Sequence, residues 1–211
     1  MKIPRLIYAF TILLGLSTHS ISHATENCSP TSDATPLHLT YPASSDLTQL
    51  VDVQFEIVGD LLKAHFNVRT TVINAKENLA TNEYPYQHDV VELFISVSGM
   101  NSDHFPYYEF EVSPFDQTLQ VQILSLKKPF INNVSMGLQH FATKTSDGWE
   151  ADIMIPLSNL KWDGQISKII GNAYSIQGAS PSRSFWGLFL PPQSKPNFHQ
   201  PQYFKPFFKC E

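Results

Sequence analysis

The sequence predicts an all-β protein, an antiparallel β-sandwich with few or very short helices. Apolar and polar residues alternate with a period of two through most of the chain, and helical periodicity is scarce. The alternating segments are short and are separated by turn residues, as in a sandwich of antiparallel strands. No internal repeat or low-complexity tract divides the 211 residues, so we expect a single domain.

The clearest hairpin lies between residues 51 and 68. Apolar residues occupy every second position from Val51 to Ile57, and again from Ala64 to Val68. Gly59-Asp60 lies between the two runs and supplies a tight turn. These two strands should therefore pair and turn one apolar face each toward the core.

Two further segments predict strands with different surroundings. Asp89–Val97 is apolar on both faces, as expected for a strand between two layers. Tyr108, Phe110 and Val112 alternate with Glu109 and Glu111, which predicts a strand with one solvated face. Similar patterns predict strands at residues 119–123, 149–155 and 169–176, with Trp149 in the core, and a helical turn at Leu157–Leu160.

Two segments lack strand periodicity. Thr70–His88 is long and polar and contains the aromatic cluster Tyr84-Pro85-Tyr86. This segment is predicted to be a surface loop with a functional role. From Pro181 onward the chain holds six prolines and eight aromatic residues. Because proline at this density disfavours central strands, we expect loops here, ending in an edge strand near Tyr203–Phe208.

The first 24 residues have the pattern of a secretory signal peptide. Two basic residues precede the apolar run Leu6–Leu16, and Ser22-His23-Ala24 offers small residues for cleavage. The run is well short of the roughly 20 residues that span a bilayer. We therefore expect residues 1–24 to be removed, residues 25–211 to form the domain, and the protein to be periplasmic or secreted and free of the membrane.

The net charge of the chain disfavours some classes of binding partner, and its two cysteines predict a disulfide bond. Without residues 1–24 the chain keeps 12 of its 14 basic residues and all 19 acidic ones, a formal net charge of −7. This charge disfavours nucleic acid and anionic membranes, and we expect a monomer. The only two cysteines, Cys28 and Cys210, should form a disulfide between the two ends in an oxidising compartment, with two free thiols as the alternative.

The acidic residues and histidines of the sequence favour a protein without a catalytic site. Glu109 and Glu111 project from one strand face, roughly 7 Å apart at Cα, a distance that overlaps the range of inverting glycosidases. Adjacent carboxylates on one face point the same way, so a solvated face is the preferred interpretation. A haem site would need a histidine with Met100, Met136 or Met154, and no attachment motif accompanies them.

Four blocks of the sequence resemble the family 9 carbohydrate-binding modules and their relatives. The blocks are His88–Ile95, Tyr107–Val112, Gly148–Leu157 and Asn197–Phe204, and they follow in the family's order. Together they cover roughly residues 61–208. The resemblance implies a β-sandwich related to domains that carry haem in other lineages, which keeps a haem-binding electron-transfer domain as an alternative.

The resemblance also implies where a sugar would bind. In sugar-binding members two aromatic rings clamp a terminal sugar, and these positions fall on Tyr86 and Phe198, where the family usually has tryptophan. The family's carboxylate corresponds to Glu92. Its basic and amide positions fall on Glu111 and Ser113, a departure that affects the expected sugar specificity. The alternatives are that Tyr86 covers a loop, Phe198 belongs to the core and Glu92 caps a buried network.

The sequence thus predicts an exported carbohydrate-binding protein. Tyr86, Glu92, Asn197 and Phe198 would contact an oligo- or polysaccharide, and Trp186 is a further candidate for lining the groove. We expect no enzyme activity of its own, although the protein would assist polysaccharide degradation; a glycoside hydrolase is the weaker alternative. No cofactor or catalytic metal is expected. Relatives hold a structural calcium ion, and no acidic loop in this sequence requires one.

Overall fold

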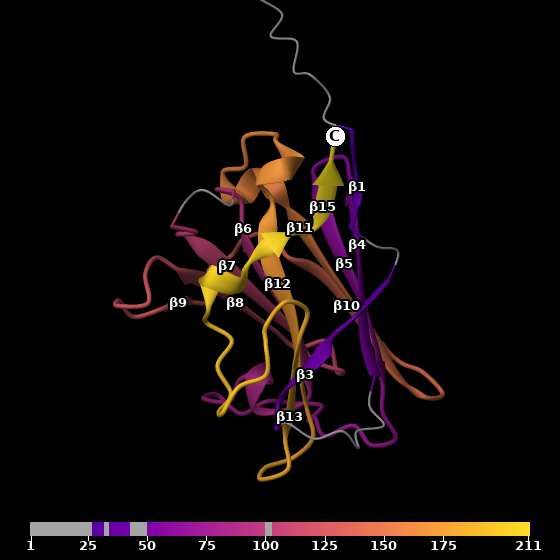
Figure 1. Ribbon diagram of the computed structural model, residues 1–211. Helices are drawn as coiled ribbons and strands as arrows, with labels where there is room; N and C mark the ends of the chain where they lie inside the picture. Colours follow the sequence, from indigo (N-terminus) through magenta and orange to yellow (C-terminus); the bar gives the residue numbers. More distant parts are fainter. Residues whose placement is uncertain (1–26, 32–33, 43–49, 100–102) are drawn as a thin grey trace, which may run out of the picture.

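The computed structural model describes residues 27–31, 34–42, 50–99 and 103–211, and it has an all-β architecture of antiparallel sheets (Figure 1). The strands are β1 (Cys28–Pro30), β2 (Thr35–Pro36), β3 (His38–Tyr41), β4 (Leu50–Val58), β5 (Leu61–Arg69), β6 (Val90–Ser96), β7 (Tyr107–Val112), β8 (Thr118–Ile123), β9 (Ile131–Asn132), β10 (Gln139–Lys144), β11 (Gly148–Pro156), β12 (Ile170–Gln177), β13 (Ser184–Gly187), β14 (Lys205–Pro206) and β15 (Phe208–Cys210). Short 3-10 turns are η1 (Pro85–Gln87), η2 (Leu157–Leu160), η3 (Ile166–Lys168) and η4 (Pro201–Tyr203). The predicted all-β sandwich and the helical turn at Leu157–Leu160 are confirmed. The predicted signal peptide lies outside the described residues.

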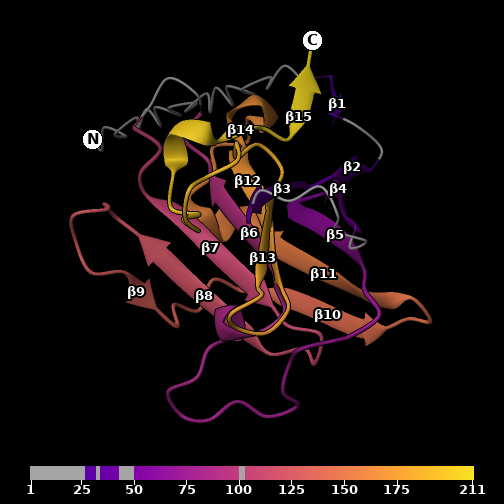
Figure 2. The ribbon, with the colours of Figure 1, turned by 60° about the horizontal axis from the view of Figure 1, so that its bottom comes forward.

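Apart from the antiparallel pair β1–β15, the strands form two packed sheets. The larger has the order β3-β13-β12-β6-β7-β8-β9, with β14 paired to the end of β12, and the smaller has the order β10-β11-β5-β4-β2. The predicted hairpin is β4–β5, which turns at Gly59, where φ is +63°, a conformation that favours glycine. Figure 2 shows β8 and β9 at one edge of the larger sheet and β10 and β11 on the other side of the molecule.

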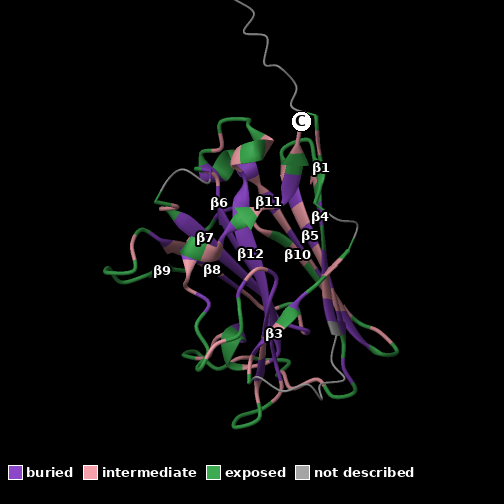
Figure 3. Cartoon of the chain, viewed as in Figure 1, coloured by how far each residue is buried: buried purple, intermediate pink, exposed green. Residues whose placement is uncertain are grey.

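The larger sheet is covered on both faces. Between the two sheets lies the main core, which includes Phe66, Phe110 and Trp149, all fully buried. A second apolar cluster on the outer face of the larger sheet includes Phe94 and Tyr174. In Figure 3 β6 and β12 are coloured as buried along their length, because the C-terminal segment of the chain covers this outer face.

The structure corrects one expectation about the proline-rich segment. Residues after Pro181 were expected to form only loops before an edge strand, but Ser184–Gly187 forms β13, which lies between β3 and β12 inside the larger sheet. The strand fits because it is short and none of its four residues is proline. Near the C-terminus, β14 pairs with the end of β12, and β15 pairs with β1.

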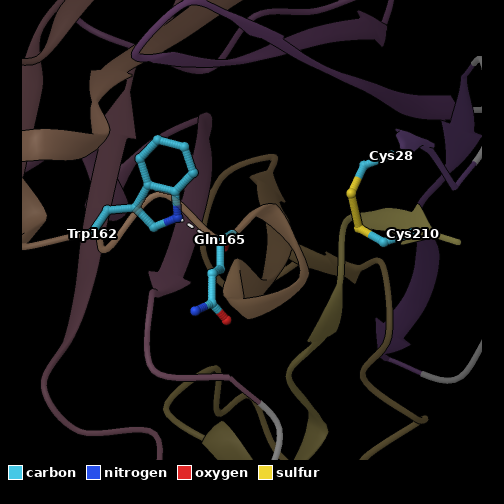
Figure 4. The surroundings of a disulfide bond; sticks show 4 residues. All are labelled: Cys28, Trp162, Gln165 and Cys210. Atoms are coloured by element: carbon cyan, nitrogen blue, oxygen red, sulfur yellow. Dashed lines mark hydrogen bonds between the residues drawn. A yellow bond between two sulfur atoms is a disulfide. The ribbon is translucent and has the colours of Figure 1, made fainter. Parts of the chain in front are cut away.

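A disulfide bond joins the ends of the described chain, as predicted. Cys28 and Cys210 face each other in the register of β1 and β15, 182 residues apart in sequence (Figure 4). In the β1–β15 pair Pro30 lies opposite Phe208, whose side chain packs in the main core. Within the described residues, no helix has the length and apolar character needed to cross a membrane.

Replacing both Cys28 and Cys210 by serine should lower the free energy of unfolding by about 2–5 kcal/mol, because the unfolded chain regains the freedom that the long closed loop removes. Urea unfolding monitored by tryptophan fluorescence measures the change. A reductant should destabilise the wild type to the same extent and leave the double variant unaffected. Equal stability of the two proteins under oxidising conditions would contradict this expectation.

Candidate functional site

A pocket of about 400 Å³ lies on the outer face of the larger sheet. Its floor consists of side chains from β6, β7, β8 and β12, and residues 196–199 of the C-terminal segment border it. The volume is within the range typical of small-molecule sites. The lining residues are Tyr86, Glu92, Phe94, Glu109, Glu111, Leu119, Val121, Phe130, Asn132, Ile176, Phe185, Pro196, Asn197, Phe198 and His199.

Three carboxyl groups lie together on the floor of this pocket. Residues at alternate positions of a strand point to the same face, so Glu109 and Glu111 of β7 both face outward. The antiparallel register places Glu92 of β6 directly opposite Glu111. Neighbouring residues in such a pair have Cβ atoms about 5 Å apart. The fold thus gathers three acids that are up to 19 residues apart in the sequence.

The expectation that Glu109 and Glu111 form a solvated face is wrong. Glu109 is 6 % exposed, Glu111 is fully buried and Glu92 is 2 % exposed. The alternation itself was interpreted correctly, because Tyr108, Phe110 and Val112 do face the main core. What the pattern did not show is the second layer that η1 and the C-terminal segment lay over the opposite face.

Burial makes these carboxyl groups weak acids. It raises the pKa of Glu109 to about 7. Burial likewise holds the pKa of Glu111 well above its usual range, and repulsion from the charges of Glu92 and Glu109 adds to the effect. The pKa of Glu92 is also well above normal, first because of burial and then because of Glu109. Protons are therefore retained in the cluster at pH values where exposed glutamates are fully ionised.

Arg183 is close to the pocket, and its positive charge partly offsets the negative charge of Glu92. Its guanidinium group donates hydrogen bonds to the backbone carbonyls of Tyr86 and His88, which ties the β12–β13 connection to η1. Attraction to the guanidinium opposes the rise in the pKa of Glu92. Burial lowers the pKa of Arg183 itself, while Glu92 and Asp89 favour its charged form.

His199 occupies the pocket as a neutral ring. Burial lowers its pKa to about 4, so the imidazole is uncharged at neutral pH. Its Nδ1 lies 2.9 Å from the hydroxyl of Tyr107, and its Nε2 lies 3.8 Å from Oε2 of Glu109. The ring also packs against Phe94, with centroids 5.2 Å apart. This position makes His199 a polar edge of the pocket that carries no charge of its own.

Aromatic rings with different exposure border the pocket. Tyr86 is 41 % exposed, and its ring stacks on Tyr84 with centroids 5.5 Å apart. Phe130, which precedes β9, is 37 % exposed. Phe198 is only 7 % exposed, because its ring stacks on Tyr174 at 4.1 Å within the outer cluster. Tyr86 and Phe130 therefore offer open ring surface, whereas Phe198 offers little.

Four of the five sequence-predicted contact residues line this pocket: Tyr86, Glu92, Asn197 and Phe198. Asn197 is at the rim, and its Oδ1 accepts a hydrogen bond from the backbone N–H of His199. Trp186 is elsewhere. Its side chain is buried in the main core between the sheets, and its Nε1 donates to Oγ of Ser184.

Sequence reasoning missed three features of the pocket. Glu109 and Glu111 were examined, but as an exposed pair. Phe130 has no sequence signal of a binding site, because it follows a lysine pair and Pro129 in a predicted turn. His199 lies in the last block of the resemblance, and its neighbour Phe198 was the residue selected there.

Of the three methionines that could ligate a haem, Met136 and Met154 lie within the described residues. Met136 packs in the core between the sheets, while His199 faces the pocket on the outer side of the larger sheet. Met100 lies outside the described residues. Among the residues that the structure describes, no group of three or more His, Cys, Asp and Glu side chains is arranged to hold a metal ion.

Comparison with solved structures defines the class of fold. A Bacteroides uniformis protein assigned to carbohydrate binding matches 81 % of this chain and 83 % of its own, with 18 % identity and a TM-score of 0.64. A family 9 carbohydrate-binding module from Caldicellulosiruptor kristjanssonii, solved with cellotriose, matches 82 % of this chain and 78 % of its own, with 15 % identity and a TM-score of 0.50. The chain therefore has a fold like that of the family 9 carbohydrate-binding modules, as the sequence blocks predicted.

Comparison with curated protein sequences gives further relatives. The UPF0462 protein C4orf33 homologs of Mus musculus and Rattus norvegicus are 27 % and 25 % identical over 128 and 129 residues, each match covering 58 % of this chain. The chain spans about three fifths of the length of these curated relatives. No protein-family model matches the sequence.

The raised pKa of Glu109 predicts a pH-dependent stability. Between pH 4.5 and 7 the folded state holds a proton on Glu109 that the unfolded state releases, so the free energy of unfolding falls as pH rises through this window. Glu109→Gln has no titrating carboxyl group at this position, so it should not show this fall in the free energy of unfolding. Relative to wild type, the variant should gain up to about 3 kcal/mol between pH 4 and pH 8.

Urea unfolding at pH 4, 6 and 8 measures this difference. Glu56→Gln is the matched control, since Glu56 is exposed on β4 of the smaller sheet and lies outside the buried cluster. A gap between wild type and Glu109→Gln that stays constant across the three pH values would show that Glu109 titrates normally.

Proposed function

We propose that this chain is an exported carbohydrate-binding protein and that the pocket on the outer face of the larger sheet is its saccharide site. The observation that carries the proposal is the composition of the pocket. Exposed rings of Tyr86 and Phe130 border a floor of buried carboxyl groups in a concavity of about 400 Å³.

This composition suits the chemistry of a sugar ring. A pyranose has an apolar face of C–H groups that packs on an aromatic ring, and a rim of hydroxyl groups that hydrogen-bonds carboxylates and amides. Tyr86 and Phe130 offer the rings, while Glu92 and Asn197 offer acceptors and donors from the floor and the rim. Solved structures with this fold include the module bound to cellotriose, which supports a saccharide as the ligand.

We further propose that the protein acts without catalysis, as a binding partner for enzymes that degrade polysaccharides. The disulfide between Cys28 and Cys210 supports a periplasmic or secreted location, because such bonds persist in oxidising compartments. The sequence-based expectations of a cleaved signal peptide, a monomer and the absence of a cofactor belong to the same proposal.

One observation favours a glycoside hydrolase as a second candidate. A pKa of about 7 for Glu109 is what a general acid needs, and Glu111 is two residues away on the same strand. The arrangement argues against it, because Glu92, Glu109 and Glu111 all rise from one floor and do not stand on opposite sides of a slot.

Under the binding proposal, the purified protein releases no reducing sugar from a broad panel of polysaccharides between pH 5 and pH 8. A reducing-sugar assay with long incubation makes the measurement. Release of sugar that disappears in Glu109→Gln would establish the hydrolase instead. The same release in wild type and variant would indicate a contaminating enzyme.

Tyr86→Ala and Phe130→Ala should each weaken saccharide binding about tenfold, since loss of one stacking surface removes roughly 1.4 kcal/mol. A glycan array identifies the ligand, and calorimetry measures the affinities. Phe198→Ala should weaken binding as well, but with a loss of stability because its ring is buried against Tyr174.

Two control variants test the position of the site. Phe141 is 57 % exposed on β10, in the other sheet, so Phe141→Ala should bind like wild type. Trp186→Phe should lower stability and leave affinity unchanged, because Trp186 is in the core between the sheets. Normal binding by both Tyr86→Ala and Phe130→Ala would remove the pocket as the site even if a sugar binds.

A further inference from the structure

The floor of the pocket is acidic, and the residues that line the pocket supply little positive charge to balance it. Among the described residues that line the pocket, three are glutamates and none is lysine or arginine. Glu111 uses one oxygen, Oε2, to accept a hydrogen bond of 3.0 Å from the backbone N–H of Tyr86. Its other oxygen, Oε1, is buried without a donor from the backbone or from a basic side chain, and the side chain that shares a hydrogen bond with Glu111 is Glu109, a second acid. A buried acceptor that lacks such a donor is a position where a donor from a ligand would be favoured.

The groups around the three glutamates provide little positive charge to balance them. Arg183 directs its guanidinium to two backbone carbonyls, and Asp89 accepts from the backbone N–H groups of Asn74 and Gly178. His199 is neutral near pH 7. The titratable and charged groups that face the three glutamates from the surrounding elements are Tyr86, Tyr107, Tyr174, Arg183 and His199, and Asp89 lies beyond them against Arg183. Of these, Arg183 alone carries a positive charge at neutral pH.

We propose that the pocket selects a saccharide that bears a protonated amino group, with the ammonium lying among Glu92, Glu109 and Glu111. This inference rests on the proposed saccharide binding and specifies its ligand class. An ammonium group has three donors and no acceptor, which matches a floor made of carboxyl oxygens. A neutral hydroxyl has a single donor and brings no positive charge to the cluster.

The geometry favours an amine attached to a sugar over a bare metal ion. No group of three His, Cys, Asp or Glu side chains among the described residues is arranged for metal coordination, whereas an ammonium tolerates longer contacts to several oxygens. The exposed rings of Tyr86 and Phe130 meanwhile provide surface for the C–H face of the sugar that carries the amine. Cations are also attracted to the faces of aromatic rings.

Calorimetry with two disaccharides that differ only in the C2 substituent of each ring, and hence in charge, tests the proposal. The β-1,4-linked dimer of glucosamine should bind at least about tenfold tighter than cellobiose at pH 7, as expected for a buried charge-assisted hydrogen bond. The N-acetylated dimer keeps the nitrogen without its charge and should lose this advantage. The affinity for the glucosamine dimer should rise from pH 5 to pH 7, because acidification neutralises the carboxylates.

Titrations in two buffers with different ionisation enthalpies give a second readout. Binding of the glucosamine dimer at pH 6.5 should release protons from the protein, since an incoming cation lowers the pKa of the three acids. Cellobiose should release none. This signal depends on the coupling of charge to binding and would not follow from a merely structural role of the glutamates.

Charge-neutral variants locate the effect. Glu92→Gln, Glu109→Gln and Glu111→Gln should each reduce the affinity for the glucosamine dimer, relative to that for cellobiose, about tenfold. Three variants are made so that the loss of one to misfolding leaves the others. Glu56→Gln, on the exposed face of the smaller sheet, is the matched control and should change neither affinity.

The outcomes separate this inference from the proposed function. Equal affinity for the glucosamine dimer and cellobiose, with both weakened by Tyr86→Ala, overturns the amine preference and leaves the saccharide site standing. Binding of neither sugar class, in calorimetry and on a glycan array, overturns both. Tighter binding of the amine that is unchanged in all three glutamine variants would also overturn the inference, because the charge would be recognised elsewhere.

Discussion

The antiparallel pairing of β6 with β7 is the constraint on which the site depends. Its register sets Glu92 opposite Glu111 and turns Glu109 to the same face. The other face of the same two strands contributes to the main core, so a slip by one residue would bury the glutamates between the sheets and expose their apolar neighbours. The register is thus held by the hydrophobic core, and the acidic floor is its consequence.

The C-terminal segment converts this polar face into a pocket. Phe198 stacks on Tyr174 of β12, and the hydroxyl of Tyr174 donates a hydrogen bond to the backbone carbonyl of Phe198. The chain then continues through β14, which pairs with β12, and β15, which pairs with β1 and carries the disulfide. Pro196 to His199 are therefore held by the contacts of Phe198 and by the paired strands that follow. This anchoring explains how a segment rich in proline and loops can hold one wall of a site.

Burying three carboxyl groups opposes folding, because burial disfavours their charged forms and the acids repel one another once ionised. Protonation relieves this cost in the free protein, and a bound cation would relieve it in the complex. Arg183 relieves part of it at Glu92 only, since its hydrogen bonds go to the backbone of η1 and its neighbour. Stability and ligand preference are consequently properties of the same cluster, and a change in its charge alters both.

The sequence by itself determined the all-β class, the β4–β5 hairpin, the disulfide pairing and the apolar face of β7, because each follows from local periodicity or from the cysteine count. The resemblance also selected Tyr86, Glu92, Asn197 and Phe198, which the fold brings to one pocket. Only the tertiary structure decided that Glu109 and Glu111 are buried, that Trp186 belongs to the core and that Phe130 borders the pocket. Strand alternation indicates which side chains share a face, whereas whether that face meets water depends on segments far away in the chain.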